Sequence, residues 1–197
     1  MTERVSEIFA EYDNRRQGSI RHDVKSMIMQ RVFGIACGYK DLNDHDTLRH
    51  DIAWQTAAGW TDTLASSPTL RRLEQLADKK LCMTIMKLQI ELFIESFESA
   101  PEEIILDFDN TDDPVHGSQE GRFFNGYYDE YCFLPLYVFC GEKLVCSLLQ
   151  TSNIDGAKYA GAVLKMITTQ VREKWPEVKI IYRGDSGFAR KTPFILV

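Results

Sequence analysis

The pattern of apolar and polar positions changes its period near Pro101. Before this proline, apolar residues recur at steps of three and four, which is the spacing of one face of an amphipathic helix. After it, short apolar runs are bounded by glycine, proline and polar residues, which is typical of strands. The pattern predicts an α+β chain with a helical region over residues 1–100 and a second region over residues 101–197.

Two helices are expected before the first loop signal. The first lies within residues 19–39, and its stripe at helical spacing comprises Ile20, Val24, Met27, Ile28, Arg31 and Ile35. The second begins near Asp46 or Thr47, either of which could cap it, and runs through Ala58. Gly59 would end it, because glycine readily adopts the conformation that follows a helix.

A third and longer helix is expected after the loop signal at residues 66–69. Its periodic run extends from Leu70 to about Phe97, and its buried face comprises Leu73, Leu76, Leu81, Ile85, Leu88, Leu92 and Phe93. Stripes of this kind usually pack against a core, so they identify structure rather than chemistry.

The second region begins with an apolar strand over residues 104–109 that ends on carboxylates. Residues 131–140 and 144–150 are predicted to form two further strands, joined as a hairpin by the turn at 141–143. Pro135 has no N–H to donate to a neighbouring strand, so an edge or a bulge is expected there.

A helix over residues 153–174 and a fourth strand over 178–182 follow the hairpin. The order of strand, hairpin, helix and strand is the beginning of the ribonuclease-H-like fold. In that fold the first and fourth strands lie side by side. The predicted architecture is therefore a helical region followed by an incomplete ribonuclease-H-like domain.

Composition places few limits on function. The 197 residues are 44% hydrophobic and 26% charged, as in ordinary globular proteins. Five cysteines are scattered without a Cys-x-x-Cys pair, which argues against a zinc site or a disulfide framework and suits a reducing cytoplasm. The longest apolar stretch is too short for a membrane span. A net charge of −6 would not by itself suggest a DNA-binding protein.

Two aspartates are the candidate chemical groups, because each follows a predicted strand. Asp109 and Asp185 are 185 − 109 = 76 residues apart, yet the expected strand order would bring them together. Transfer at a phosphodiester commonly uses two divalent ions that are bridged by carboxylates. Mg²⁺ takes hard oxygen ligands and keeps several waters, so two or three carboxylates suffice to bind it.

The sequence motifs around both aspartates resemble those of bacterial insertion-sequence transposases with a group-one DDE domain. The first-aspartate segment contains Leu-Asp-Phe-Asp-Asn-Thr, and the second reads Tyr-Arg-Gly-Asp-Ser-Gly-Phe-Ala-Arg. Motifs in the helical region also resemble those of this family. The resemblance covers residues 19 to 190, and its motifs lie at 31–41, 48–51, 64–74, 105–121, 123–139 and 182–190.

The resemblance implies Mg²⁺- or Mn²⁺-dependent cleavage of DNA at the element's ends, followed by attack of the freed 3′-hydroxyl on target DNA. Asp109 would be the first metal ligand and Asp185 the second, with Asp107 as the alternative to Asp109. The expected partners are the terminal inverted repeats and target DNA, and a homodimer is a candidate assembly. No membrane association is expected, and the location would be the cytoplasm of a bacterium, at the nucleoid.

The family's third acidic residue, a glutamate beyond the second aspartate, has no counterpart here, because no Asp or Glu follows Asp185. The sequence is therefore interpreted as a truncated copy with doubtful catalysis. The alternative is a catalytically inactive chain that binds element ends as an inhibitor, or the product of a pseudogene.

Several other side chains are candidates for contact with DNA. Arg71 and Arg72 follow a helix start, Arg183 adjoins the second aspartate, and Gln119 and His116 lie just past the first. A solvated helix face or a polar turn is the structural alternative for each of them.

A phosphatase of the haloacid-dehalogenase type is a remote alternative. Its Asp-x-Asp-x-Thr signature matches Asp107, Asp109 and Thr111, with Asp107 as the nucleophile. However, Ala189 stands where that family's later motif needs a second Asp.

Overall fold

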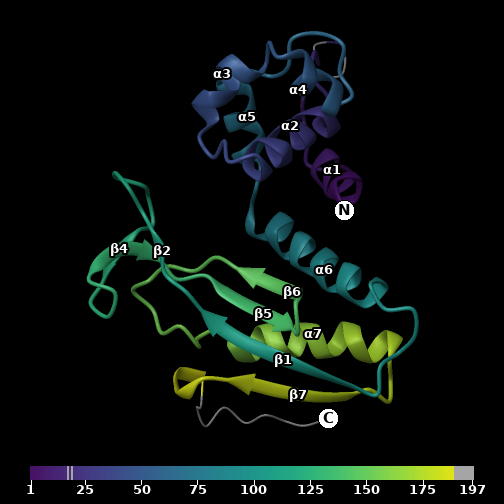
Figure 1. Ribbon diagram of the computed structural model, residues 1–197, viewed down its shortest axis with the longest axis vertical. Helices are drawn as coiled ribbons and strands as arrows, with labels where there is room; N and C mark the ends of the chain where they lie inside the picture. The colour runs from purple at the N-terminus through teal and green to yellow at the C-terminus, as the bar shows by residue number, and fades with distance from the viewer. Residues whose placement is uncertain (17, 19, 189–197) are drawn as a thin grey trace. The chain divides into compact units, whose positions relative to one another are not determined.

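The computed structural model describes residues 1–16, 18 and 20–188. The chain forms two compact units, Met1–Ile85 and Met86–Val197 (Figure 1). The end of the second-aspartate motif, Ala189 and the C-terminal segment lie outside the described residues. In the described part, no helix is long and apolar enough to cross a membrane.

Helices make up the first unit. Its elements are α1 (Thr2–Ala10), α2 (Val24–Ala36), the short 3₁₀ helix η2 (Leu42–Asp44), α3 (His45–Leu48), α4 (Ile52–Ala57), α5 (Ser67–Glu74) and the start of α6 (Lys79–Glu95). Its core comprises Val24, Met27, Ile28, Ala65, Leu70 and Leu73. The stripe predicted for the first helix is confirmed at Val24, Met27 and Ile28. It is wrong at Ile35, which is half exposed in the last turn of α2.

The second predicted helix is two short helices. Asp51 interrupts it, since its carboxylate accepts hydrogen bonds from the N–H groups of Ala53 and Trp54 and so starts α4. Asp46 caps neither helix and instead accepts from the N–H and hydroxyl of Ser67. The predicted stop is confirmed, because Gly59 follows α4 with φ +67°.

The long periodic run is also divided, into α5 and α6. Asp78 accepts a hydrogen bond of 2.7 Å from the N–H of Leu81, which is the geometry of a helix start. The apolar period continues across the break. This explains why the pattern alone predicted one helix, while the predicted face is still buried or half-buried from Leu73 to Phe93.

A four-stranded sheet organises the second unit, with strand order β6-β5-β1-β7. The strands are β1 (Glu103–Asn110), β5 (Leu136–Cys140), β6 (Lys143–Leu148) and β7 (Lys179–Gly184). β1 pairs with β5 antiparallel and with β7 parallel, and the arrowheads of β1 and β7 point the same way in Figure 1. The predicted adjacency of the first and fourth strands is confirmed.

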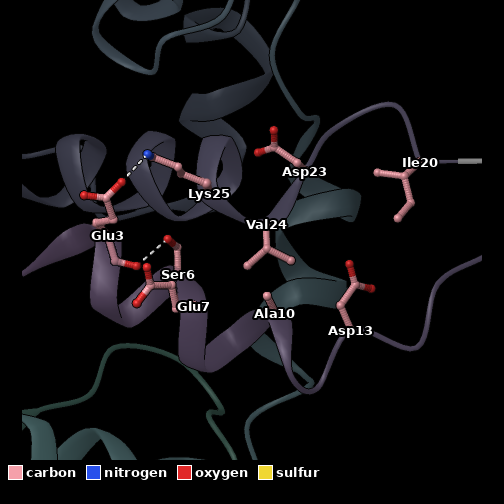
Figure 2. A pocket seen from close by; sticks show the side chains of 9 residues that line it. All are labelled: Glu3, Ser6, Glu7, Ala10, Asp13, Ile20, Asp23, Val24 and Lys25. Atoms are coloured by element: carbon pink, nitrogen blue, oxygen red, sulfur yellow. Dashed lines mark hydrogen bonds and ion pairs between the residues drawn. The ribbon is translucent and has the colours of Figure 1, made fainter. Parts of the chain in front are cut away.

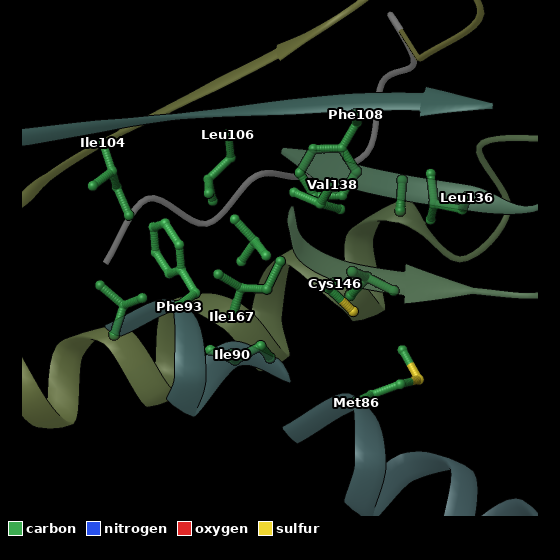
Figure 3. Close-up of a cluster of buried hydrophobic side chains, with 14 of the residues drawn as sticks. Met86, Ile90, Phe93, Ile104, Leu106, Phe108, Leu136, Val138, Cys146 and Ile167 are labelled. Atoms are coloured by element: carbon green, nitrogen blue, oxygen red, sulfur yellow. The ribbon is translucent and has the colours of Figure 1, made fainter. Parts of the chain in front are cut away.

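One face of this sheet carries the core. Ile104, Leu106 and Phe108 of β1 alternate with more exposed residues and point toward helical residues such as Ile90 and Ile167 (Figure 3). Both the C-terminal half of α6 and helix α7 (Ala160–Lys174) contribute to this cluster. The other face of β1 therefore carries Ile105, Asp107 and Asp109.

Two predictions about this unit need correction. The strand predicted over 131–140 is divided at Pro135, because proline cannot donate to the ladder. Its first part is β4 (Glu130–Phe133), which pairs with β2 (Asp113–Pro114) and β3 (Phe123–Asn125) in a separate three-stranded sheet. The helix predicted from residue 153 begins only at Ala160, after a series of turns.

Candidate active site

The register of β1 and β7 fixes the relation between the two candidate aspartates. Asp107 pairs with Arg183 and Phe108 with Gly184, an offset of 76 residues in each case. Asp109 and Asp185 have the same offset, so they are the next positions beyond the last bonded pair. Neighbouring strands lie about 4.8 Å apart, so the register puts the two residues at adjacent strand ends.

Asp109 belongs to the face of β1 that is opposite the core. Side chains two residues apart on a strand point to the same side, so Asp109 shares this face with Asp107, which contacts Arg183 of β7. Asp185 follows the last residue of β7 and leads into the short 3₁₀ helix η3 (Ser186–Phe188). Both Asp109 and Asp185 are exposed.

Asp107 is held by an ion pair. The Nε of Arg183 donates to Asp107 Oδ1, and Nη2 donates to Oδ2 at 2.6 Å, so both carboxylate oxygens are engaged. The hydrogen bond from Arg183 is the largest effect on the Asp107 carboxyl and lowers its pKa; burial opposes this shift, and the positive charge of Arg183 adds a smaller lowering. Arg183, predicted as a DNA contact, is in this structure the partner of Asp107.

Asp109 and Asp185 have fewer protein donors. The Oδ1 of Asp185 accepts a hydrogen bond of 2.8 Å from the N–H of Gly187, which leaves Oδ2. Among the residues that the structure describes, none donates to the Asp109 carboxylate. Carboxylate oxygens directed to solvent at the end of a rigid sheet are suitable ligands for a hard cation.

The end of β1 is fixed by a close approach of the chain. The Nδ2 of Asn110 donates to the carbonyl of Pro135 at 3.2 Å. A methyl group on Gly156 would lie 2.5 Å from Asn110 Oδ1, so only glycine fits there without displacement. Asn110 and Gly156 thus position the strand end that carries Asp109. No pattern in the sequence predicted this contact.

The remaining predicted residues lie elsewhere. Arg71 and Arg72 are exposed in the last turn of α5, where Arg72 donates to the hydroxyl of Thr69 at 3.2 Å. Gln119 and His116 are exposed in the segment between β2 and β3. Of the candidates, only the three aspartates and Arg183 are brought together by the sheet.

A pocket of about 360 Å³ lies in the helical unit (Figure 2). Lys25 contributes its one basic side chain and is paired with Glu3 at 2.6 Å, while Glu7, Asp13 and Asp23 add further negative charge. An acidic lining disfavours phosphate groups. The pocket therefore offers no site for a nucleic acid.

Within residues 1–16, 18 and 20–188, no group of three or more His, Cys, Asp or Glu side chains is arranged to hold a metal ion. The strand ends thus present two carboxylates rather than a complete cluster.

Comparison with known proteins agrees with the fold. A family model described as "Transposase DDE domain group 1" matches residues 1–195. No curated protein and no solved structure matches the chain. Because the family match covers nearly all of the sequence, the chain belongs to the group 1 family of transposase DDE domains.

Proposed function

We propose that Asp109 and Asp185 bind a divalent cation, Mg²⁺ or Mn²⁺, and that the chain acts there on phosphodiesters at the ends of an insertion sequence. Transposase DDE domains generally depend on divalent metals and act on DNA. The observation that supports the proposal is the common offset of 76 residues, which puts the two aspartates at the ends of adjacent parallel strands.

The donor set fits such an ion. Carboxylate oxygens are the hard ligands that Mg²⁺ prefers, and exposed strand ends leave room for the waters that it retains. Asp107 is the weaker candidate for the first ligand, because Arg183 occupies both of its oxygens. A bound ion of this kind would activate the attacking oxygen and stabilise the charge on the leaving one.

Neighbouring residues would orient this site. Asn110 fixes the end of β1 through the Pro135 carbonyl, and the Gly187 N–H restrains the Asp185 carboxylate. Arg183 forms an ion pair with Asp107, so the negative charge of the Asp107 carboxylate is compensated. These contacts favour a site with two ligand carboxylates rather than a diffuse acidic surface.

The test is a titration of the full chain with Mn²⁺, in which electron paramagnetic resonance measures the bound ion. Asp109→Asn and Asp185→Asn should each weaken binding at least tenfold. Glu142→Gln is the matched control, because Glu142 is an exposed carboxylate in the β5–β6 turn, at the opposite end of β1 from Asp109. Unchanged Mn²⁺ affinity in both aspartate variants would contradict the proposal.

Iron-generated hydroxyl radicals give an independent measurement. Fe²⁺ bound at the site should cut the backbone close to Asp109 and Asp185, and an excess of Mg²⁺ should suppress both cuts. A chain that binds DNA but shows neither cut nor Mn²⁺ binding would instead act as a non-catalytic DNA-binding protein.

A further inference from the structure

The small sheet β2-β4-β3 exposes aromatic side chains that the site has not used. Tyr127 is 88% exposed, Phe124 52% and Tyr131 49%. Large aromatic rings are costly to leave in water unless they meet a partner, so a cluster of them marks a contact surface. We define the aromatic platform as Arg122, Phe124, Tyr127 and Tyr131.

Three members of the platform contact one another in order. Phe124 and Tyr131 are directly opposite each other on β3 and β4, with ring centroids 5.6 Å apart and planes at 68°. The guanidinium of Arg122 lies over the Tyr131 ring at 4.4 Å, which is a cation–π distance. Arg122 thus adds a positive charge to an otherwise apolar surface.

The acidic residue Glu130 lies on the other face of this hairpin. Glu130 precedes Tyr131 on β4 and therefore points to the opposite side. Burial, and then a hydrogen bond with Asp112, raise the pKa of the Glu130 carboxyl. The platform face consequently carries aromatic rings and Arg122, while the Glu130–Asp112 pair lies behind it.

The platform is connected to the proposed metal site through β2. β2 begins at Asp113, four residues after Asp109, and pairs with β4, the strand that carries Tyr131. The turn between β3 and β4 carries Tyr127, whose ring meets that of Tyr128 edge-on at 4.9 Å.

We propose that the aromatic platform stacks unpaired bases of DNA next to the phosphodiester that the site acts on. Exposed aromatic rings with an interleaved arginine bind single strands, because every base has a face that can stack. The segment has a single arginine and several carboxylates, so phosphate neutralisation contributes little. Binding should accordingly depend only weakly on salt, in contrast to binding through a basic groove.

This inference rests on the proposed function for the identity of the substrate, but its test needs no metal. The probe is a fluorescein-labelled oligothymidylate of roughly 12 nucleotides, within the range that one single-strand site covers. Its anisotropy is titrated with the full chain in EDTA. A blunt duplex of the same length and an abasic oligonucleotide with the same phosphates are the competitors.

The wild-type chain should bind the oligothymidylate at least tenfold more tightly than the abasic strand. Phe124→Leu and Tyr131→Leu should each lose roughly tenfold in affinity, because one stacked base is lost. Tyr131→Phe keeps the ring and should remain within about twofold of wild type. Tyr159→Leu replaces a half-exposed tyrosine outside the platform and is the control.

Equal affinity for the abasic strand, or unchanged binding by both leucine variants, would overturn the proposal. A preference for the blunt duplex would also overturn it. The two proposals fail separately, since Asp109→Asn should lose Mn²⁺ binding yet retain the oligonucleotide, whereas Tyr131→Leu should do the reverse.

Discussion

Carboxylates in the helical unit and at the sheet end are used in different ways. In the first unit, aspartates accept backbone N–H groups where helices begin, as at Asp23, Asp41, Asp51 and Asp78. At the sheet end, Asp109 lies at the next-to-last position of β1 and lacks a donor among the described residues. The difference separates aspartates that stabilise the backbone from one that is available to a ligand.

Buried polar groups show the same contrast. Gln30 is fully buried and bridges α2 to the loop before α5. The Nε2 of Gln30 donates to the carbonyl of Ala65, and the Oε1 of Gln30 accepts from the N–H of Ala65. His45 packs beside it with Nδ1 3.4 Å from the Gln30 amide. In the sheet unit, the candidate residues lie on the exposed face and contribute nothing to the core cluster.

The largest expected effect comes from removing the Gln30 bridge. Gln30→Leu leaves the buried N–H and carbonyl of Ala65 without partners, which should lower the free energy of unfolding by about 3 kcal/mol. Urea unfolding followed by circular dichroism measures it. Gln75→Leu, at an exposed position after α5, should stay within about 0.5 kcal/mol. Equal midpoints for both variants would show that Gln30 is not a structural bridge.

Crowding the end of β1 should have the next largest effect. Gly156→Ala places a methyl group against Asn110 Oδ1 and should destabilise the chain by about 2 kcal/mol. It should also weaken Mn²⁺ binding, because Asn110 must move. Gly126→Ala meets no atom within 4 Å and is the control. If Gly156→Ala behaves like Gly126→Ala in both assays, the close approach has no role at the site.

A matched pair of aspartates tests the comparison directly. Asp51→Ala removes the cap of α4 and should lower stability by about 1 kcal/mol. Asp109→Ala should cause no such loss, because no described residue donates a hydrogen bond to the Asp109 carboxylate. Thermal unfolding without metal measures both variants. A similar loss from each would abolish the distinction between structural and available carboxylates.

A smaller effect is expected from pH. Burial, reinforced by the charge of Arg31, lowers the pKa of His45 below its ordinary value of 6.5. The unfolded chain then binds more protons, so this contribution to stability is present above pH 6.5 and is lost as the pH falls below it. His45→Gln should reduce the change in stability between about pH 7.5 and pH 5, as measured by urea unfolding.

His50→Gln, at an exposed position, should leave this pH dependence unchanged. His22 should contribute in the same direction as His45, since burial also lowers its pKa. A full pH dependence in the His45→Gln variant would assign the effect to other groups.

The sequence pattern predicted the sheet better than the helix boundaries. The apolar runs that end on carboxylates identified β1 and β7, and the expected strand order gave their adjacency. The role of the aspartate pair stays a prediction. The interruptions at Asp51 and Asp78 were missed, since a capping aspartate does not alter the apolar period on either side.

The spacing of apolar residues along the chain could not predict contacts between residues that are far apart in the sequence. Nothing local to Gly156 points to Asn110, and the ion pair between Asp107 and Arg183 depends on the register of two strands. Pro135 predicted an irregular strand, but it did not predict that β4 would belong to a second sheet. The exposure of the rings of Phe124, Tyr127 and Tyr131 was not predicted from the sequence either.

The parallel pairing of β1 with β7 makes the geometry of the aspartate pair independent of the length of chain between them. Loops in the intervening segment could gain or lose residues without moving Asp185, whereas a slip of one position in β7 would carry it to the other side. Such a slip would also turn Arg183 into the packed interior and expose Ile180 and Tyr182. Burying the charged Arg183 would be unfavourable, so the arginine that neutralises Asp107 also disfavours a shifted register of β7.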